Sequence, residues 1–266
     1  MPSHENGHAS RKPSANRSIA AAVLTEGLLI SCRARQTSPP AFGQARIIIL
    51  PTPVLRDRTC RSYLLRVAKE RLTVPVWRDV PAAPHTRRTE GPVRIIAVGS
   101  IYPRKRSLDL LQALPALDGL PVELHVGGRN HGLEPEFDRL AAAAEGRVHL
   151  HGEIDNEAAL ALVDRADILA LPSASECLPI APIEAGMRGV PSVLSDLAGH
   201  EGVWRHGQNC LMHPVGDVAL PGHMLRVLVS DAALRQRLGT AAKMTARRFR
   251  PDLMMVRRDL ALASAL

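Results

Sequence analysis

The sequence predicts an α/β protein in which a Rossmann-like parallel sheet of about six strands carries helices on both faces. From Val93 onward, short β-branched runs alternate with amphipathic helical stretches, a pattern typical of right-handed βαβ crossovers. Hydrophobic residues make up 45% of the chain and aromatic residues only 3%, so the core must be mainly aliphatic. Residues 93–266 are therefore expected to form one such domain that ends in helices. Residues 1–92 show no comparable alternation, and we expect them to be an irregular, basic, partly disordered region and linker.

Short apolar runs bounded by turn residues mark the expected strands. These are residues 94–98, 122–126, 148–151, 168–171, 192–194 and 210–213. Helical spacing of apolar residues marks the expected helices. These are residues 107–114, 134–145, 156–165, 180–188, 199–205, 218–229, 232–249 and 252–263. In the first third, we expect a short helix at 19–32, a short strand at 47–50 and a helix within 56–72.

The formal net charge of +8 is unevenly distributed. Residues 1–90 carry 15 Lys and Arg against 6 Asp and Glu, whereas residues 91–266 carry 19 against 20. We interpret the basic segment as a solvated arm, because its charges form no helical or stacking pattern. No nucleic-acid partner is therefore expected, while peripheral contact with anionic lipid headgroups stays open as an alternative.

No segment is apolar for long enough to span a bilayer. The best candidate, residues 19–30, is interrupted by Glu26, and an export signal would need an unbroken apolar run. The four cysteines form no C-x-x-C pair and have no histidine at metal-ligand spacing: Cys32, Cys60, Cys177 and Cys210. We expect reduced thiols in a cytoplasmic protein, with a peripheral position at the inner membrane face as the open alternative.

In open parallel sheets, ligands bind beyond the carboxyl ends of the strands, so the loops there are the candidate sites. The loop at 99–106 places Arg104, Lys105 and Arg106 just before a helix N-terminus, which suits a phosphate or diphosphate. An ordinary solvated basic loop is an equally good interpretation. The loop at 127–132 is not a dinucleotide-binding fingerprint, and the chain contains no P-loop, which weighs against a standard NAD enzyme and a P-loop NTPase. Its glycines would permit close backbone approach to a ligand, or are only turn residues.

The loop after the fourth strand, residues 172–179, leads into a helix expected to begin near Ile180, with Pro182 in its first turn. Glu176 lies on the loop and Glu184 about one turn inside the helix. A carboxylate in such a crevice can accept hydrogen bonds from two neighbouring hydroxyls of a ribose or another sugar. The alternative is a pair of exposed acids near a helix start, where the helix dipole favours them.

Two further acids, Asp164 and Asp167, we interpret as a helix end and a strand start rather than as a metal-binding D-x-D motif.

The spacing of Glu176 and Glu184, with Pro172 and Ser173 before them and Gly189 and Pro191 after them, resembles the signature of the family 4 glycosyltransferases, which have the GT-B fold. Two flanking motifs support the resemblance. They are a first loop with Gly99, Ser100, Pro103 and Lys105, and a closing segment at 199–217. The resemblance covers roughly residues 93–250 and implies the C-terminal, donor-binding half of the fold.

The resemblance implies a role for each matching residue. Lys105 would contact the donor diphosphate and Glu176 would lie beside the transferred sugar, and these two are the expected catalytic residues. Glu184 would bond the nucleotide ribose. The other expected donor-binding residues are Ser100, Arg104, Leu178, Pro179 and Ile180, with the backbone amides of Leu178 and Ile180 meeting the sugar and phosphates. Transfer would be retaining and would need neither a metal nor another cofactor, because cations and a helix N-terminus stabilise the leaving diphosphate.

Several positions depart from the family pattern. Ser100 stands where many members have an arginine, and we expect Arg104 to take its place. Arg106 stands where a glycine often follows the lysine, and Pro179 removes one N–H that could have met the ligand. Residues 1–92 are too few for the acceptor-binding domain of a GT-B enzyme, which needs on the order of 100–200 residues. The chain therefore looks truncated, divergent at its start, or dependent on a partner chain that supplies an acceptor domain.

Three functional hypotheses follow. The leading one is a glycosyltransferase that moves a hexose from a nucleotide-sugar to a glycan, lipid or small-molecule acceptor. The second is a non-catalytic nucleotide-sugar-binding module, or a remnant that needs a partner domain, and the same residues would serve it. The third is a basic protein directed at nucleic acid or membrane through residues 1–90, for which Glu176 and Glu184 would have no role.

Overall fold

The computed structural model describes residues 90–265, apart from residues 133, 145, 177 and 201, together with three short strands nearer the start of the chain. The main part contains a six-stranded parallel sheet in the order β6-β5-β4-β7-β8-β9. The strands are β4 (Val93–Val98), β5 (Val122–Gly127), β6 (Val148–Leu150), β7 (Ile168–Leu171), β8 (Ser192–Ser195) and β9 (Leu211–His213). All six expected strands are present within one residue at either end, which confirms the predicted Rossmann-like fold class.

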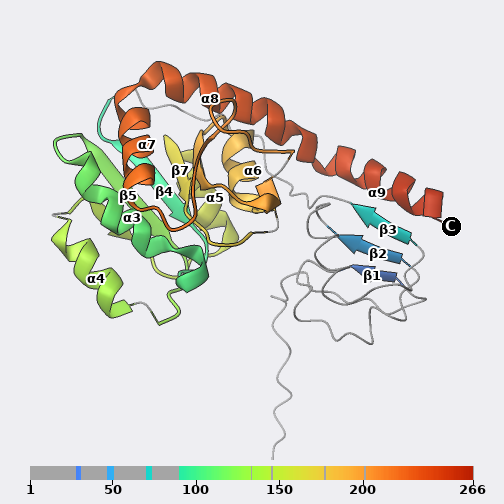
Figure 1. Ribbon diagram of the computed structural model, residues 1–266, viewed down its shortest axis with the longest axis horizontal. Helices are drawn as coiled ribbons and strands as arrows, with labels where there is room; N and C mark the ends of the chain where they lie inside the picture. Colours follow the sequence, from blue (N-terminus) through green and yellow to red (C-terminus); the bar gives the residue numbers. More distant parts are fainter. Residues whose placement is uncertain are drawn as a thin grey trace, which may run out of the picture.

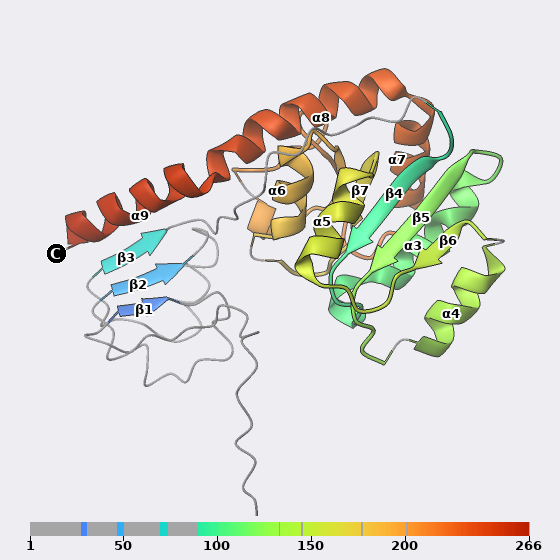
Figure 2. The ribbon, with the colours of Figure 1, turned by 180° about the vertical axis from the view of Figure 1, so that it is seen from behind.

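Helices cover both faces of this sheet. They are α3 (Ser107–Ala113), α4 (Glu134–Ala143), α5 (Asn156–Asp164), α6 (Ile180–Met187), α7 (Ala219–Ser230), α8 (Ala232–Ala246) and α9 (Pro251–Ala265), with short 3₁₀ turns η1 (Pro103–Lys105), η2 (Leu114–Leu117), η3 (Ala198–His200) and η4 (Arg247–Phe249). Figure 1 shows α3, α4 and α7 over one face, and Figure 2 shows α5 and α6 over the other. The domain is therefore a three-layer α/β sandwich.

The burial pattern of the strands explains this layering. All residues of β7 and β8 are buried, as expected for central strands of a parallel sheet covered on both sides. One core joins β4 and β5 to α3, α4 and α7, through side chains such as Ile95, Leu124 and Phe137. A second core joins the opposite face of β4 and β7 to α5 and α6, through Ile96 and Val163. Each face of the sheet is thus sealed by its own aliphatic core.

Short polar side chains set two of the helix starts. The Asp155 carboxylate accepts a hydrogen bond from the Ala158 amide at 2.8 Å and caps α5. Asp231 caps α8 in the same way through the Leu234 amide, also at 2.8 Å. Both acids satisfy amides that a helix N-terminus leaves without an internal partner.

The prediction of a helix at 199–205 is wrong. Only η3 forms there, and turns follow it. Gly202 and Gly207 adopt positive φ angles of 76° and 71°, which a right-handed helix excludes. The Asn209 side chain then holds the turn, accepting from the Arg205 amide and donating to the Val203 carbonyl.

The predictions of two helices near the start of the chain are also wrong, as far as the structure describes those residues. Residues 28–30 form strand β1 (Leu28–Ile30), not part of a helix at 19–32. Strand β3 (Glu70–Thr73) replaces the end of the helix expected at 56–72. The strand expected at 47–50 is confirmed as β2 (Ile47–Leu50). The three strands pair in parallel in the order β1-β2-β3, so pairing between segments overrides local helical spacing. The rest of both expected helices lies outside the described residues.

Within the described part of the chain, the helices are too short or too polar to cross a membrane.

Candidate functional site

The strand order reverses between β4 and β7, which creates the topological switch point where open α/β sheets bind ligands. These two strands pair directly, with Ile95 opposite Ile168. Because parallel strands end at the same edge, the loops that follow β4 and β7 leave side by side. The Ala174 amide donates to the Arg104 carbonyl at 2.8 Å and ties the two loops together.

An ion pair spans the switch point. Lys105 Nζ lies 2.6 Å from Glu176 Oε1, and Arg104 Nη1 lies 3.9 Å from Glu176 Oε2. The Glu176 side chain is only 9% exposed, and that of Lys105 19%. A nearly buried carboxylate thus faces two cations, at the place where the sequence predicts the donor diphosphate and sugar.

Arg104 is held by neighbours on both loops. Its guanidinium donates to the Ser175 carbonyl and to the Tyr102 hydroxyl, and it lies over the Tyr102 ring at 5.2 Å from the centroid. Its side chain is still 44% exposed. Arg104 therefore holds its positive charge in a fixed position near Glu176 and in contact with solvent.

The three cations expected to act together are divided by the structure. Arg106 Nε pairs with Asp109 Oδ2 at 2.6 Å, on the first turn of α3, while Arg104 and Lys105 face Glu176. Arg106 has a φ of 51°, the left-handed conformation that favours glycine. That conformation gives a physical reason for the glycine expected at this position from the resemblance.

Ser100 lies where two hollows meet at the carboxyl edge of the sheet. One is lined by residues 97–100, Lys105, Ser107, Val126 and residues 170–172. The other is lined by Gly99, Ser100, residues 127–129, residues 153–156 and Ala159. The expected donor residues Ser100 and Lys105 therefore border one hollow, and the loop after β5 contributes to the second.

One glycine of the loop after β5, Gly128, serves close backbone packing within the protein. Gly128 has a φ of 150°, and a Cβ placed on it would lie 2.0 Å from the Gly99 carbonyl oxygen. Its amide donates to the Gly152 carbonyl at 2.8 Å. The loops after β4, β5 and β6 are thus packed against each other through main-chain atoms.

The remaining expected donor residues gather at the start of α6. Leu178 is 6% exposed, Pro179 is the buried N-cap, and Ile180 is the first helical residue, as predicted. Pro182 lies in the first turn, also as predicted, and Glu184 follows in the second turn and is 6% exposed. Glu176 and Glu184 are therefore not the exposed acids of the alternative interpretation.

The two other acids lie where the sequence predicts. Asp164 is the last residue of α5 and pairs with the buried Arg188. Asp167 immediately precedes β7 and accepts a hydrogen bond from the Arg94 amide at 2.9 Å.

Sequence reasoning missed a buried histidine near the acid. His200, in η3, is 1% exposed. Burial lowers its pKa below the ordinary value, although the charge of Glu176 acts in the opposite direction. The burial of His200 thus disfavours its protonated form, while the charge of Glu176 partly offsets that effect. The motif at 199–203 could have drawn attention to His200, but the burial of its side chain could not be deduced from the sequence.

A comparison with known families matches residues 92–230 to the family described as Glycosyl transferases group 1. Two curated mycobacterial proteins are also similar in sequence. The phosphatidyl-myo-inositol mannosyltransferase of Mycobacterium leprae is 31% identical over 150 residues, covering 55% of this chain and 40% of that protein. A glycogen synthase of Mycobacterium tuberculosis is 29% identical over 167 residues, covering 61% and 40%. The chain therefore spans 40% of the length of these curated relatives.

Solved structures share the fold at low sequence identity. The Anabaena protein HepE, in complex with UDP and glucose, matches with a TM-score of 0.72 and 16% identity, over 86% of this chain and 68% of HepE. A mutant of S. aureus TarM, in complex with fondaparinux, alpha-GlcNAc-glycerol and UDP, matches with 0.71 and 15%, over 82% and 44%. The sucrose-phosphate synthase of Thermosynechococcus elongatus matches with 0.70 and 20%, over 85% and 60%.

The family match covers more than half of the 266 residues, and the fold around the switch point agrees with it. The chain therefore belongs to the group 1 glycosyl transferases.

Proposed function

We propose that this chain is a family 4 glycosyltransferase that binds a nucleotide-sugar at the β4–β7 switch point and transfers its hexose, with retention, to a glycan, lipid or small-molecule acceptor. The observation that carries the proposal is the ion pair between Lys105 and Glu176, made across the switch point in a member of a glycosyltransferase family. The relatives named as a mannosyltransferase and a glycogen synthase, and neighbours solved with UDP, support this substrate class.

In this proposal Lys105 serves two partners. An ammonium group has three N–H donors, so Nζ can keep its bond to Glu176 and also donate to a diphosphate oxygen. Arg104 adds a second charge from the mouth of the site. The two cations would neutralise the negative charge that grows on the leaving diphosphate.

The start of α6 would supply the remaining stabilisation. The first amides of a helix lack internal partners and point outward, and the helix dipole favours an anion there. Pro182 offers no N–H, so the amides of Ile180 and Ala181 are the available first-turn donors. Because two cations and this helix start can balance the diphosphate, we propose transfer without a metal or another cofactor. Activity in EDTA equal to activity with Mg²⁺ is expected.

The two glutamates would bind different parts of the donor. Glu176 would accept hydrogen bonds from hydroxyls of the transferred sugar, and Glu184 from the ribose hydroxyls. Both carboxylates are largely buried, which strengthens hydrogen bonds to them because less water competes.

Calorimetric titration of the full chain with UDP-, GDP- and ADP-sugars tests donor binding. We expect one of them to bind, and Lys105→Ala and Glu184→Gln to weaken binding at least about tenfold through loss of a charged hydrogen bond. Lys243→Ala and Glu136→Gln, at exposed positions on α8 and α4, are the matched controls. The donor site is refuted if none of the nucleotide-sugars binds, or if the controls lose as much as the site variants.

Turnover separates the enzyme from a binding module. Release of nucleoside diphosphate with an acceptor panel, and the anomeric configuration of the product by NMR, are the measurements. A product that keeps the donor's configuration supports the proposal. Binding without transfer or donor hydrolysis supports the non-catalytic module, or a chain that needs a partner to supply an acceptor domain.

A further inference from the structure

A cluster of imidazoles lies away from the switch point, on strands β5 and β6. His125 of β5 is the direct Cα partner of His149 on β6. Glu123 and His151 lie two residues away from them along the chain, and side chains two apart project from the same face. Figure 2 shows this part of the sheet beyond the cover of α5 and α6. All four side chains therefore share a face that no described helix covers.

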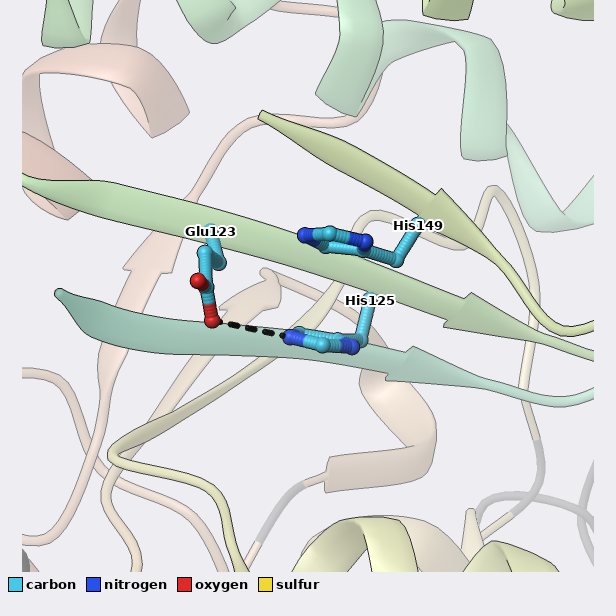
Figure 3. A group of neighbouring side chains, drawn as sticks. All are labelled: Glu123, His125 and His149. Atoms are coloured by element: carbon cyan, nitrogen blue, oxygen red, sulfur yellow. Dashed lines mark hydrogen bonds and ion pairs between the residues drawn. The ribbon is translucent and has the colours of Figure 1, made fainter. Parts of the chain in front are cut away.

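The potential ligand atoms of three of these residues converge. One atom each from Glu123, His125 and His149 lies within 4.8 Å of the others. Figure 3 shows the two rings stacked, with the carboxylate directed at one of them. The ring centroids of His125 and His149 are 4.6 Å apart, and His125 Nε2 lies 3.3 Å from Glu123 Oε2.

These separations fit a small divalent cation. Zinc binds imidazole nitrogen and carboxylate oxygen at about 2.0–2.2 Å, which places neighbouring ligands of a tetrahedral site about 3.4 Å apart. The distance between His125 and Glu123 already matches. The ligand atom of His149 already lies within 4.8 Å of the other two, and this exposed side chain is free of close packing that would prevent it from rotating toward a cation. We propose that Glu123, His125 and His149 bind Zn²⁺ on the open face of β5 and β6, with water as the fourth ligand.

Two further residues would position the ligands. His151 Nε2 lies 3.0 Å from His125 Nδ1, so His151 can accept the Nδ1 hydrogen and leave His125 Nε2 for the cation. Arg94 Nε donates to Glu123 Oε2 at 3.2 Å and orients the carboxylate. With two imidazole nitrogens and only one carboxylate, the site disfavours Mg²⁺ and Ca²⁺, which prefer several oxygen ligands.

This site is independent of the donor cleft. None of its residues belongs to the Lys105–Glu176 pair or lines the hollows at the carboxyl edge. Zinc would instead link β6, at the edge of the sheet, to β5. Binding therefore stabilises the folded chain, because it favours the state in which the two strands are paired.

Titration of the full chain, without a polyhistidine tag, with ZnCl₂ tests the inference by calorimetry. We expect one Zn²⁺ whose affinity falls at least tenfold in His149→Ala and in His125→Gln, and that MgCl₂ does not displace. His223→Ala, an exposed histidine on α7, is the matched control and should bind Zn²⁺ as the wild type does. Equal Zn²⁺ affinity in the wild type and both cluster variants overturns the proposal.

Cobalt spectroscopy and thermal unfolding supply readouts besides affinity. Co²⁺ bound to the wild type should show the intense visible ligand-field bands of a tetrahedral site, and these should be absent in His149→Ala. Zinc should raise the Tm of the wild type and of His223→Ala but not of His149→Ala. Because His149 is exposed, its variant is expected to fold, which far-ultraviolet circular dichroism checks. A Zn²⁺-induced rise in Tm that survives in His149→Ala overturns the assignment.

Discussion

Glu176 is a carboxylate held in a largely buried place by two cations that come from a loop 71 residues away in sequence. Its negative charge has two opposite effects in the proposed reaction. The carboxylate can accept hydrogen bonds from sugar hydroxyls and so orient the sugar. It also pairs with Lys105 and repels an incoming diphosphate, which lowers the affinity for the donor.

Replacing Glu176 by glutamine separates these effects. We expect a nucleoside diphosphate to bind about threefold more tightly, because the repulsion is removed and Lys105 is released. Sugar transfer should slow by about a hundredfold, because a positioned charge beside the reacting sugar is lost. Calorimetry and steady-state kinetics measure the two effects, with Glu136→Gln as control. Equal weakening of binding and turnover would contradict this role.

The carboxylate of Asp164 balances the positive charge of a buried guanidinium, that of Arg188. Arg188 is 3% exposed and pairs with Asp164, which is one-third exposed. Asp164→Asn should lower the free energy of unfolding by about 2 kcal/mol, because it leaves a buried cation without its counter-charge. Asp252→Asn, at the exposed Arg250–Asp252 pair, should change it by less than about 0.5 kcal/mol. Urea unfolding measures both, and similar losses in the two variants would argue against the buried pair.

Buried histidines predict how stability depends on pH. Burial lowers the pKa values of His200 and His213 below the ordinary value near 6.5, so below that pH the unfolded chain binds more protons than the folded one. Burial shifts His125 and His151 in the same direction. The free energy of unfolding should therefore be fully present above about pH 6.5 and fall as the pH drops through the lower folded-state values.

Urea unfolding between about pH 5 and pH 8 measures this slope. His223→Gln, at an exposed position, should leave the slope unchanged, whereas His213→Gln should flatten it. A free energy of unfolding that stays constant over this range would contradict the prediction.

At the scale of elements, the loops at the carboxyl edge of the sheet, where we propose that the donor binds, are joined by main-chain hydrogen bonds. The Ile101 amide donates to the Arg129 carbonyl and the His131 amide to the Ile101 carbonyl, at 2.8 and 2.9 Å. These bonds continue the β4–β5 pairing beyond the strands. The loop that carries Lys105 is therefore held by the sheet beneath it and by its neighbour.

Gly128→Ala tests this locking. The new Cβ would meet the Gly99 carbonyl at 2.0 Å, so one loop must move, at a cost of about 2 kcal/mol or more. Donor binding should weaken as well, because Gly99 and Ser100 border the hollow. Gly132→Ala is the control, since Gly132 also has a positive φ but has no atom within 4 Å of a new Cβ. Equal losses of stability in denaturant unfolding would show that backbone strain alone, and not the contact, matters.

At the scale of the whole molecule, the three buried cores of the described residues lie between Ile95 and Met254. Helix α9 is anchored by Met254, which is fully buried, and then extends past the six-stranded sheet toward the side where β1–β3 lie (Figures 1 and 2). Its outer part carries exposed apolar side chains, including Val256 and Leu260. Most of the described hydrophobic core therefore belongs to one unit that starts near residue 93.

Residues 90–266 are expected to fold without residues 1–89, which tests the predicted division at residue 92. Unfolding should stay cooperative, and donor affinity should stay within about threefold, because the core and the donor residues are retained. Loss of cooperative unfolding in this fragment would mean that the first segment is part of the same folding unit.

The sequence alone determined the six strands, most of the helices that separate them and the loops that carry the proposed donor residues. Each of these depends on local patterns: β-branched runs, apolar spacing at helical period, and glycine or proline at turns. The start of α6 at Ile180 is one case, because Pro182 is tolerated only in a first turn. The same local patterns failed at 199–205, where positive-φ glycines and the Asn209 side chain decide the conformation.

Only the tertiary structure decided which of these groups meet. The 3.6-residue and two-residue periods carry no information on strand order, so neither the pair Lys105 and Glu176 nor the pair His125 and His149 follows from them. The family resemblance placed Lys105 and Glu176 at one site, but their direct contact comes from the tertiary structure. Their meeting depends on which strands are neighbours: β4 with β7 in one case, β5 with β6 in the other. Burial likewise depends on how helices cover the sheet, which is why Glu176 is enclosed while His149 stays exposed.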